Sequence, residues 1–191
     1  MNLKETIRAM ISKFQLLNKE EIEIIVEKTI VDEFKKGTLL LKEGQIPKKC
    51  YMVVEGCVRE YIIKDGEEKS TAFFIEGDTF TPHSKDSKPS TYYWECAEDC
   101  ILTISNKNYE EELRALLPRL DSVFQEIAVG KINNLRNEWN LFITSSPEER
   151  YHNLIETKPH LLDRVPQHQI ASYLGMKPQS LSRIRKRILD T

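Results

Sequence analysis

The chain has 191 residues, of which 40% are hydrophobic and 30% are charged, so we expect a packed core rather than a disordered chain. No apolar run is long enough to span a membrane, and charged residues within 1–14 exclude a secretory signal peptide. Four cysteines are too few for a disulfide scaffold, so we expect a reducing, cytoplasmic location without membrane contact.

The net charge of −2 excludes a generally basic coat protein, but charge is unevenly distributed along the chain. Residues 1–145 hold 20 Lys and Arg against 25 Asp and Glu, whereas residues 146–191 hold 8 against 5. Within 175–189 there are five basic residues and no acidic one. An acidic body with a basic tail indicates that the tail meets an anion, although cations also suit a solvated helix end.

Residues 1–31 are predicted to form two helices. Apolar residues recur at helical spacing in the first: Leu3, Ile7, Met10, Ile11 and Phe14. The second is expected to begin near Asn18, because Glu21 three residues later would complete a capping box.

From about residue 32 to 105 the pattern changes to strands and turns. Five of the seven glycines lie in this stretch, and Asp65-Gly66 is a hairpin signal. The predicted strands are short, apolar and rich in β-branched or aromatic residues: 38–41, 50–54, 58–63, 71–75, 91–96 and 101–104. Short strands separated at regular intervals by glycine turns predict a small β-barrel or jelly roll.

After Pro118 the spacing is helical again for about five turns. A narrow apolar seam runs along this segment: Phe124, Ala128, Ile132, Leu135, Trp139 and Phe142. Such a seam is typical of a dimer helix, and Gly130 near its middle suits close approach of another backbone. The alternative is a helix that packs on its own barrel.

The C-terminal segment carries the most informative motif. Ser146-Pro147-Glu148-Glu149 predicts a helix start, and that helix should end before Pro159. Two short helices are expected at 167–174 and 178–189. Ala171 would let them cross closely and Gly175 would supply a left-handed turn, which is a helix-turn-helix pattern.

The second of these helices is predicted to read DNA in the major groove. Its outward residues, with Lys177 just before it, are the candidate DNA-binding set: Lys177, Gln179, Ser180, Ser182, Arg183, Lys186 and Arg187. Arg pairs bidentately with guanine and Gln with adenine, whereas Ser and Lys suit phosphates. The alternative is an ordinary helical hairpin, but the unopposed basic face argues against it.

The order of parts resembles the CRP/FNR family of bacterial transcription regulators. The segments that carry the resemblance are Lys36–Gly44, Tyr51–Arg59, Gly77-Asp78-Thr79-Phe80, Leu174-Gly175-Met176 and Ser180–Ile184. The resemblance implies an α+β fold, in which a jelly roll of the cyclic-nucleotide-binding type with flanking helices precedes a long dimerisation helix and a winged-helix-like helix-turn-helix. The domain boundaries expected are 1–117, 118–145 and 146–191. The resemblance to the family also implies a homodimer that binds a palindromic operator.

The sequence departs from the family where cyclic-nucleotide binders hold the ligand. Their Gly-Glu falls at Thr81-Pro82 and their Arg-Ser/Thr pair at Ser90-Thr91, where only Thr91 keeps the family's residue type. Without the arginine that neutralises the cyclic phosphate, cyclic AMP is not the expected effector. Lys85 and Lys88 are weak substitutes. A different pocket could involve Phe80, Thr81, His83, Ser90, Thr91 and Tyr92, although these residues could equally be core and surface.

No cofactor and no metal are expected. The cysteines lack the spacing of an iron–sulfur site and are interpreted as buried thiols, and one histidine in the roll supports neither haem nor a cupin metal centre. No catalytic motif is present, so an enzyme is not expected. The partners expected are double-stranded DNA and a second copy of the chain, with RNA polymerase and an unidentified small molecule as further candidates. The alternative function is a sensor that acts through protein contacts without DNA.

Overall fold

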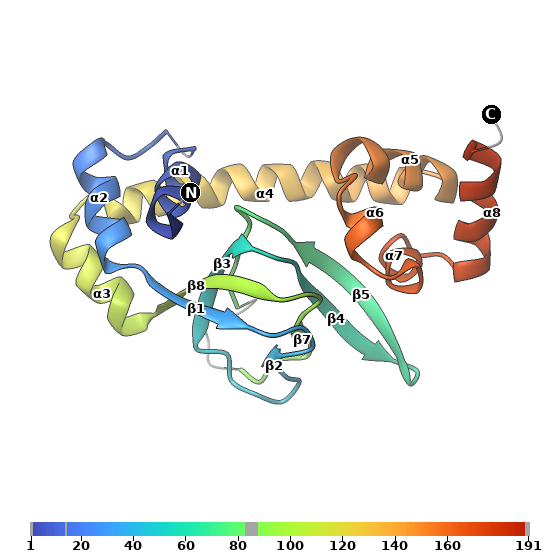
Figure 1. Cartoon of the computed structure of the whole chain (residues 1–191), viewed down its shortest axis with the longest axis horizontal. Coiled ribbons are helices and arrows are strands. Elements are labelled where there is room, and N and C mark those ends of the chain that lie inside the picture. Colours follow the sequence, from blue (N-terminus) through green and yellow to red (C-terminus); the bar gives the residue numbers. More distant parts are fainter. Residues whose placement is uncertain (1, 14, 83–87, 190–191) are drawn as a thin grey trace.

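The computed structural model describes residues 2–13, 15–82 and 88–189 of the chain. Phe14, His83 and Lys85, which the sequence interpretation named, lie outside these residues. The structure confirms the predicted α+β class: a β-roll between two groups of helices, with one long helix along its side (Figure 1).

The roll consists of two four-stranded antiparallel sheets. One has the order β1-β8-β3-β6 and the other β2-β7-β4-β5, which makes β5 an edge strand. The strands are β1 (Ile30–Phe34), β2 (Leu39–Leu41), β3 (Lys49–Glu55), β4 (Val58–Lys64), β5 (Glu67–Phe74), β6 (Thr79–Phe80), β7 (Tyr93–Cys96) and β8 (Cys100–Asn106).

Aromatic and aliphatic side chains from both sheets fill the roll. Phe80 lies near the centre of this core, stacked on Phe74 and Tyr51 at ring-centroid distances of 4.7 and 5.2 Å. The predicted hairpin turn is present, because Asp65 and Gly66 both have positive φ, 55° and 77°, between β4 and β5. Paired positive φ values match the right-handed twist of the strands that this turn joins.

Two short helices cover one end of the roll. α1 (Leu3–Ser12) and α2 (Lys19–Lys28) share an apolar cluster with β3, and the capping box predicted at Asn18 is formed. α3 (Lys107–Leu116) follows β8 directly, capped by Asn106. α4 (Leu120–Thr144) then runs along the roll toward the opposite end, as Figure 1 shows.

The remaining helices form the unit at that opposite end, residues 146–189, here termed the C-terminal unit. It contains α5 (Pro147–Thr157), α6 (Leu161–Arg164), α7 (Gln167–Tyr173) and α8 (Pro178–Leu189). Ser146 caps α5 through the predicted capping box, with Pro147 at its first position. The regular elements described in this unit are all helices, so the structure contains the helix-turn-helix without a strand-built wing.

Four elements were not predicted. β1 is largely solvent-exposed and therefore shows little apolar alternation, and β6 has only two residues. α3 and the four-residue α6 lie in segments that the spacing left unassigned. The strand predicted at 71–75 begins four residues earlier, at Glu67, because the polar end of β5 still pairs with β4.

Candidate nucleic-acid interface

The helix-turn-helix forms around the two small residues that the sequence singled out. Ala171 is fully buried, and Gly175 has a φ of 68°. The amide of Met176 donates to the Ala171 carbonyl and that of Gly175 to the Ser172 carbonyl, which is the Schellman arrangement at a helix end. α7 therefore ends sharply, and α8 leaves it at a fixed angle.

α8 presents its polar side to solvent. Leu181 and Ile184 are buried against α5 and α7, and they fix the rotation of the helix about its axis. The residues predicted to bind DNA are all exposed: Lys177, Gln179, Ser180, Ser182, Arg183, Lys186 and Arg187. Figure 1 places α8 at the end of the molecule farthest from α1 and α2, with no other element beyond it.

Arg187 of this set forms an ion pair within the C-terminal unit. Its guanidinium pairs with the carboxylate of Glu148 at the start of α5, with an Nε to Oε1 distance of 3.2 Å. The pair orients Arg187 toward α5 rather than leaving it to extend freely from α8. Sequence reasoning assigned Glu148 only to a helix start and missed this contact.

A second arginine joins α4 to the helix-turn-helix. Arg150 of α5 donates to the carbonyls of Phe142 and Leu174, at 3.0 and 3.1 Å, and lies over the Phe142 ring at 4.1 Å. Gly175 packs beside this contact, where an added Cβ would lie 3.2 Å from Arg150 Nη1. Phe142, expected in the dimer seam, thus also holds Arg150 of α5 through its carbonyl and its ring. Arg150 carried no local sequence signal.

The C-terminal unit packs against the roll. Ser172 Oγ accepts a hydrogen bond from the Ser70 amide at 3.0 Å, and so satisfies part of the open edge of β5. Phe73 of β5 meets Tyr173 edge to face, with ring centroids 5.4 Å apart. Cys57, at the turn before β4, is buried in the same apolar cluster, and burial raises the pKa of its thiol to about 12.

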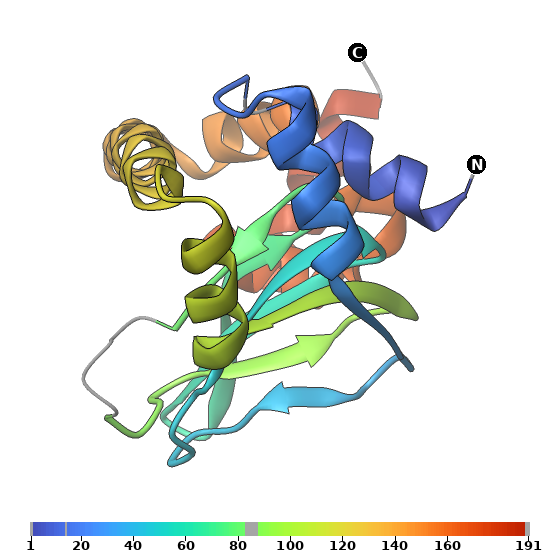
Figure 2. The same ribbon diagram turned by 90° about the vertical axis from the view of Figure 1, so that its left-hand side faces the viewer.

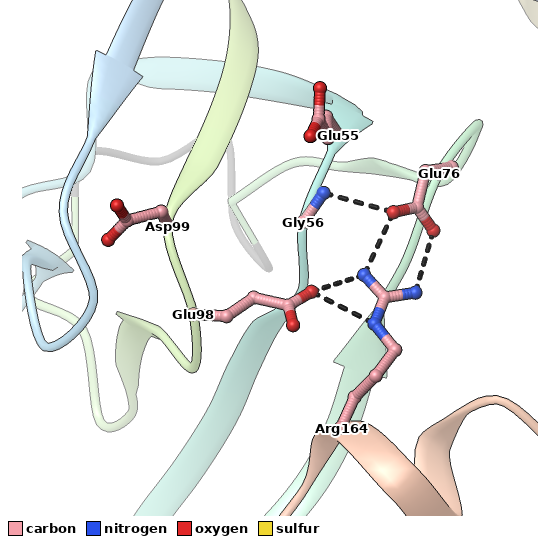
Figure 3. A pocket seen from close by; sticks show the side chains of 6 residues that line it. All are labelled: Glu55, Gly56, Glu76, Glu98, Asp99 and Arg164. Atoms are coloured by element: carbon pink, nitrogen blue, oxygen red, sulfur yellow. Dashed lines mark hydrogen bonds and ion pairs between the residues drawn. The ribbon is translucent and has the colours of Figure 1, made fainter.

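Arg164 of α6 forms an ion-pair cluster with the roll (Figure 3). Its Nη1 and Nη2 donate to the two oxygens of Glu76 at 2.9 and 2.8 Å, and its Nε donates to Glu98 at 2.9 Å. Burial alone would raise the pKa of Glu76, but hydrogen bonds from Arg164 and from the Gly56 amide outweigh it and hold that pKa below its ordinary value. These residues line an open recess of about 370 Å³.

The predicted dimer residues lie on an exposed face of α4. Phe124, Ile132, Leu135 and Trp139 are 42%, 63%, 67% and 60% exposed, and Ala128 is exposed beside them. Figure 2 looks along α4 and shows its outer side turned away from both sheets. An added Cβ on Gly130 would meet nothing within 4 Å, so this chain alone does not explain that glycine.

The residues suggested for an effector pocket fall into two groups. Phe80, Ser90 and Tyr92 are buried in the roll. Ser90 Oγ donates a hydrogen bond to the Tyr92 carbonyl at 2.7 Å, so this hydroxyl is already used within the chain. Thr81 and Thr91 are exposed, and His83 lies outside the described residues. α4 reaches this region through Lys131, whose Nζ donates to the Thr79 carbonyl at 3.1 Å.

Buried charge in the roll is a feature that the strand pattern did not reveal. Glu60 accepts hydrogen bonds from Trp94 Nε1 at 2.9 Å and Thr71 Oγ1 at 2.8 Å, and Arg59 donates to Ser70 Oγ at 2.8 Å.

All four cysteines are free thiols. Within the described residues, no group of three His, Cys, Asp or Glu is arranged to hold a metal, and no helix has the length and hydropathy to cross a bilayer.

Comparison with known proteins agrees with this architecture. Residues 31–115 match the family model of the cyclic nucleotide-binding domain. FixK2 from Bradyrhizobium japonicum is a similar solved structure, with 19% identity over 85% of each chain and a TM-score of 0.70. The chain has the fold of the CRP/FNR regulators.

Two further structures share the CRP/FNR fold over nearly the whole chain. CooA from Carboxydothermus hydrogenoformans, solved as a mutant, has 16% identity, covers 93% of this chain and 87% of its own, and gives a TM-score of 0.65. The Catabolite Activator Protein of Thermus thermophilus has 19% identity, with coverage of 93% and 86% and a TM-score of 0.57. No curated relative matches the sequence. The resemblance inferred from the sequence motifs is therefore confirmed at the level of fold.

Proposed function

We propose that this chain is a sequence-specific DNA-binding transcription regulator that acts in the cytoplasm. The observation that carries the proposal is the exposed polar face of α8, whose opposite side packs into the apolar core of a helix-turn-helix at one end of the molecule. Residues 146–191 bear an excess of three positive charges, which suits the phosphate backbone. FixK2 and the Catabolite Activator Protein, which share the fold, support the same assignment.

We propose that two copies pair through the exposed seam of α4. An apolar helical face of this length, with Ile132, Leu135 and Trp139 all more than half exposed, is characteristic of a dimer contact. Pairing would place two α8 helices on opposite sides of a two-fold axis. To enter successive major grooves of a palindromic operator they would have to lie about 34 Å apart.

Arg183 and Lys186 are assigned different roles in recognition. Arg183 is the proposed base reader, because its planar guanidinium can donate two parallel hydrogen bonds to guanine. Lys186, a point charge on a flexible stem, is proposed to bind phosphate. An effector other than cyclic AMP would act by binding one arrangement of the two copies better than another. RNA polymerase remains a candidate partner of the DNA-bound dimer.

Selection from a random duplex pool, with purified protein at moderate salt, tests the proposal. We expect an enriched palindrome for the wild type, without effector or with a metabolite panel added. Arg183→Ala should relax preference at one base pair per half-site by roughly 1–3 kcal/mol. Lys186→Ala should keep the preferred sequence and should reduce the slope of log affinity against log salt concentration by about one.

The selection also has outcomes that would contradict these assignments. Weak, salt-sensitive binding without enrichment under every condition would favour the alternative, a sensor that acts through protein contacts. A change of preferred base on Lys186→Ala, with none on Arg183→Ala, would reverse the two roles.

A further inference from the structure

The C-terminal unit and the roll share one apolar cluster. Cys57 and Phe73 of the roll are 0% and 2% exposed, and they pack with Leu161, Leu174 and other buried residues of the unit. Domains joined by a flexible linker usually keep a polar interface and move independently. Here the shared apolar cluster favours a single docked orientation.

Arg164 joins three parts of the chain at the rim of this cluster. It belongs to α6, Glu76 to the turn between β5 and β6, and Glu98 to the turn between β7 and β8. The paired hydrogen bonds to Glu76 fix the plane of the guanidinium, and the Gly56 amide holds the same carboxylate at 3.0 Å (Figure 3). Because the Arg164 side chain is only 23% exposed, the ion pair is less screened than a surface pair.

The docked orientation leaves the DNA-binding face of α8 uncovered. Arg164, Ser172 and Tyr173 contact the roll, whereas Gln179, Arg183 and Lys186 are exposed to solvent. Docking therefore does not mask the proposed recognition surface. A docked unit has already lost rotational freedom that a free one would lose on DNA.

We infer that Arg164 is a positioning residue for DNA binding, which locks the C-terminal unit on the roll with α8 facing outward. The inference rests on the proposed DNA binding for its functional part, but the lock itself is testable without DNA. Apparent affinity scales with the fraction of molecules in the competent state, so a tenfold loss of docking would weaken binding about tenfold.

Cysteine alkylation in the full-length protein measures the lock directly. Cys57 lies under the docked unit, whereas Cys96 and Cys100 are buried in the roll, and Cys50 is half-buried. With iodoacetamide and mass spectrometry, Arg164→Gln should raise the labelling rate of Cys57 at least tenfold. Cys96 and Cys100 should stay protected, which shows that the roll remains folded. Arg8→Gln, which removes the Arg8–Glu23 ion pair at the opposite end, is the matched control and should leave Cys57 protected.

DNA affinity then distinguishes positioning from simple charge effects. Arg164→Gln removes a positive charge, so weaker DNA binding alone could be electrostatic. The double variant Glu76→Gln/Glu98→Gln removes two negative charges and should strengthen binding if charge alone matters. If the lock matters, it should weaken binding about tenfold, with the preferred sequence unchanged.

Each outcome decides the proposal. Increased Cys57 labelling together with weaker DNA binding in both the Arg164 and the double glutamine variants supports it. Unchanged Cys57 labelling overturns the lock, and unchanged or stronger DNA binding by the double variant overturns its role in recognition. If the wild type binds no DNA, the proposed function fails, and the labelling result still decides whether Arg164 holds the unit in place.

Discussion

At the scale of single residues, Gly56 has the tightest surroundings of any glycine described. It has a φ of 103°, and an added Cβ would lie 2.6 Å from the Asp99 carbonyl oxygen and 2.7 Å from Cys100 Sγ. Its amide also donates to Glu76, the carboxylate that holds Arg164. Gly37 has a comparable φ of 81° but open space around it. Comparing alanine variants at the two positions therefore separates the cost of backbone strain from the cost of steric overlap.

Gly56→Ala should therefore destabilise the protein far more than Gly37→Ala. A left-handed alanine costs about 1–2 kcal/mol at either site, and overlap with the turn before β8 adds roughly 1–3 kcal/mol at Gly56 alone. Chemical denaturation of both variants measures the difference in the free energy of unfolding. Equal losses would mean that the β7–β8 turn moves aside without cost.

At the scale of elements, α4 is a helix whose apolar residues have few partners in its own chain. Leu135 is 67% exposed, and Asn133 lies on nearly the opposite side of the same helix. Since Leu135 contributes little to the fold of one chain, its replacement should act on association rather than on folding.

If the proposed dimer forms through this face, Leu135→Glu should convert it to a folded monomer, because an unpaired carboxylate is costly to bury in an apolar contact. Asn133→Glu adds the same charge to the other side of α4 and should leave the proposed dimer intact. Sedimentation velocity at micromolar concentration measures the mass, and circular dichroism checks that the helix is retained. A Leu135→Glu protein that still sediments as a dimer would place the interface elsewhere.

The sequence was sufficient for elements with local signals and insufficient for contacts between distant segments. Asp65-Gly66, the capping box at Ser146 and the turn at Gly175 each act through neighbours a few residues away, so their type and position were predictable. β1 is mostly exposed and carries little apolar periodicity, which is why it was missed.

The candidate interface shows the same division. The exposure of the α8 residues followed from helical periodicity, since Leu181 and Ile184 fix the buried side. The roles of Arg164 and Arg150 did not follow. Arg164 meets carboxylates 66 and 88 positions away in the sequence, and no spacing rule within α6 encodes such a contact.

At the scale of the whole molecule, the Arg164 cluster makes stability depend on pH. The pKa of Glu76 is lowered in the folded protein, so the unfolded chain binds more protons as the medium is acidified. The stabilisation is therefore complete above the ordinary carboxyl pKa of 4.5 and is lost as pH falls through the lowered folded value.

Glu76→Gln should be less stable than the wild type at pH 7, and the difference should shrink as pH falls from about 5 toward 3. The free energy of unfolding, measured by denaturant titration at several pH values, tests this. Glu23→Gln is a control at the other end of the molecule, where the carboxylate pairs with Arg8 on an exposed surface. A difference that stays constant with pH would show that Glu76 contributes through packing rather than charge.

The contact of Ser172 with β5 limits how freely the C-terminal unit could be exchanged for that of another protein. A chimera cut after residue 145 would remove the hydroxyl that satisfies the outer edge of β5, and would uncover Phe73 and Cys57. An open strand edge beside an apolar patch invites aggregation. The part that could be transferred intact is the C-terminal helices together with the β4–β5 surface on which they pack. A change of the proposed DNA specificity is therefore better made by substitutions on the exposed face of α8 than by exchanging the whole segment.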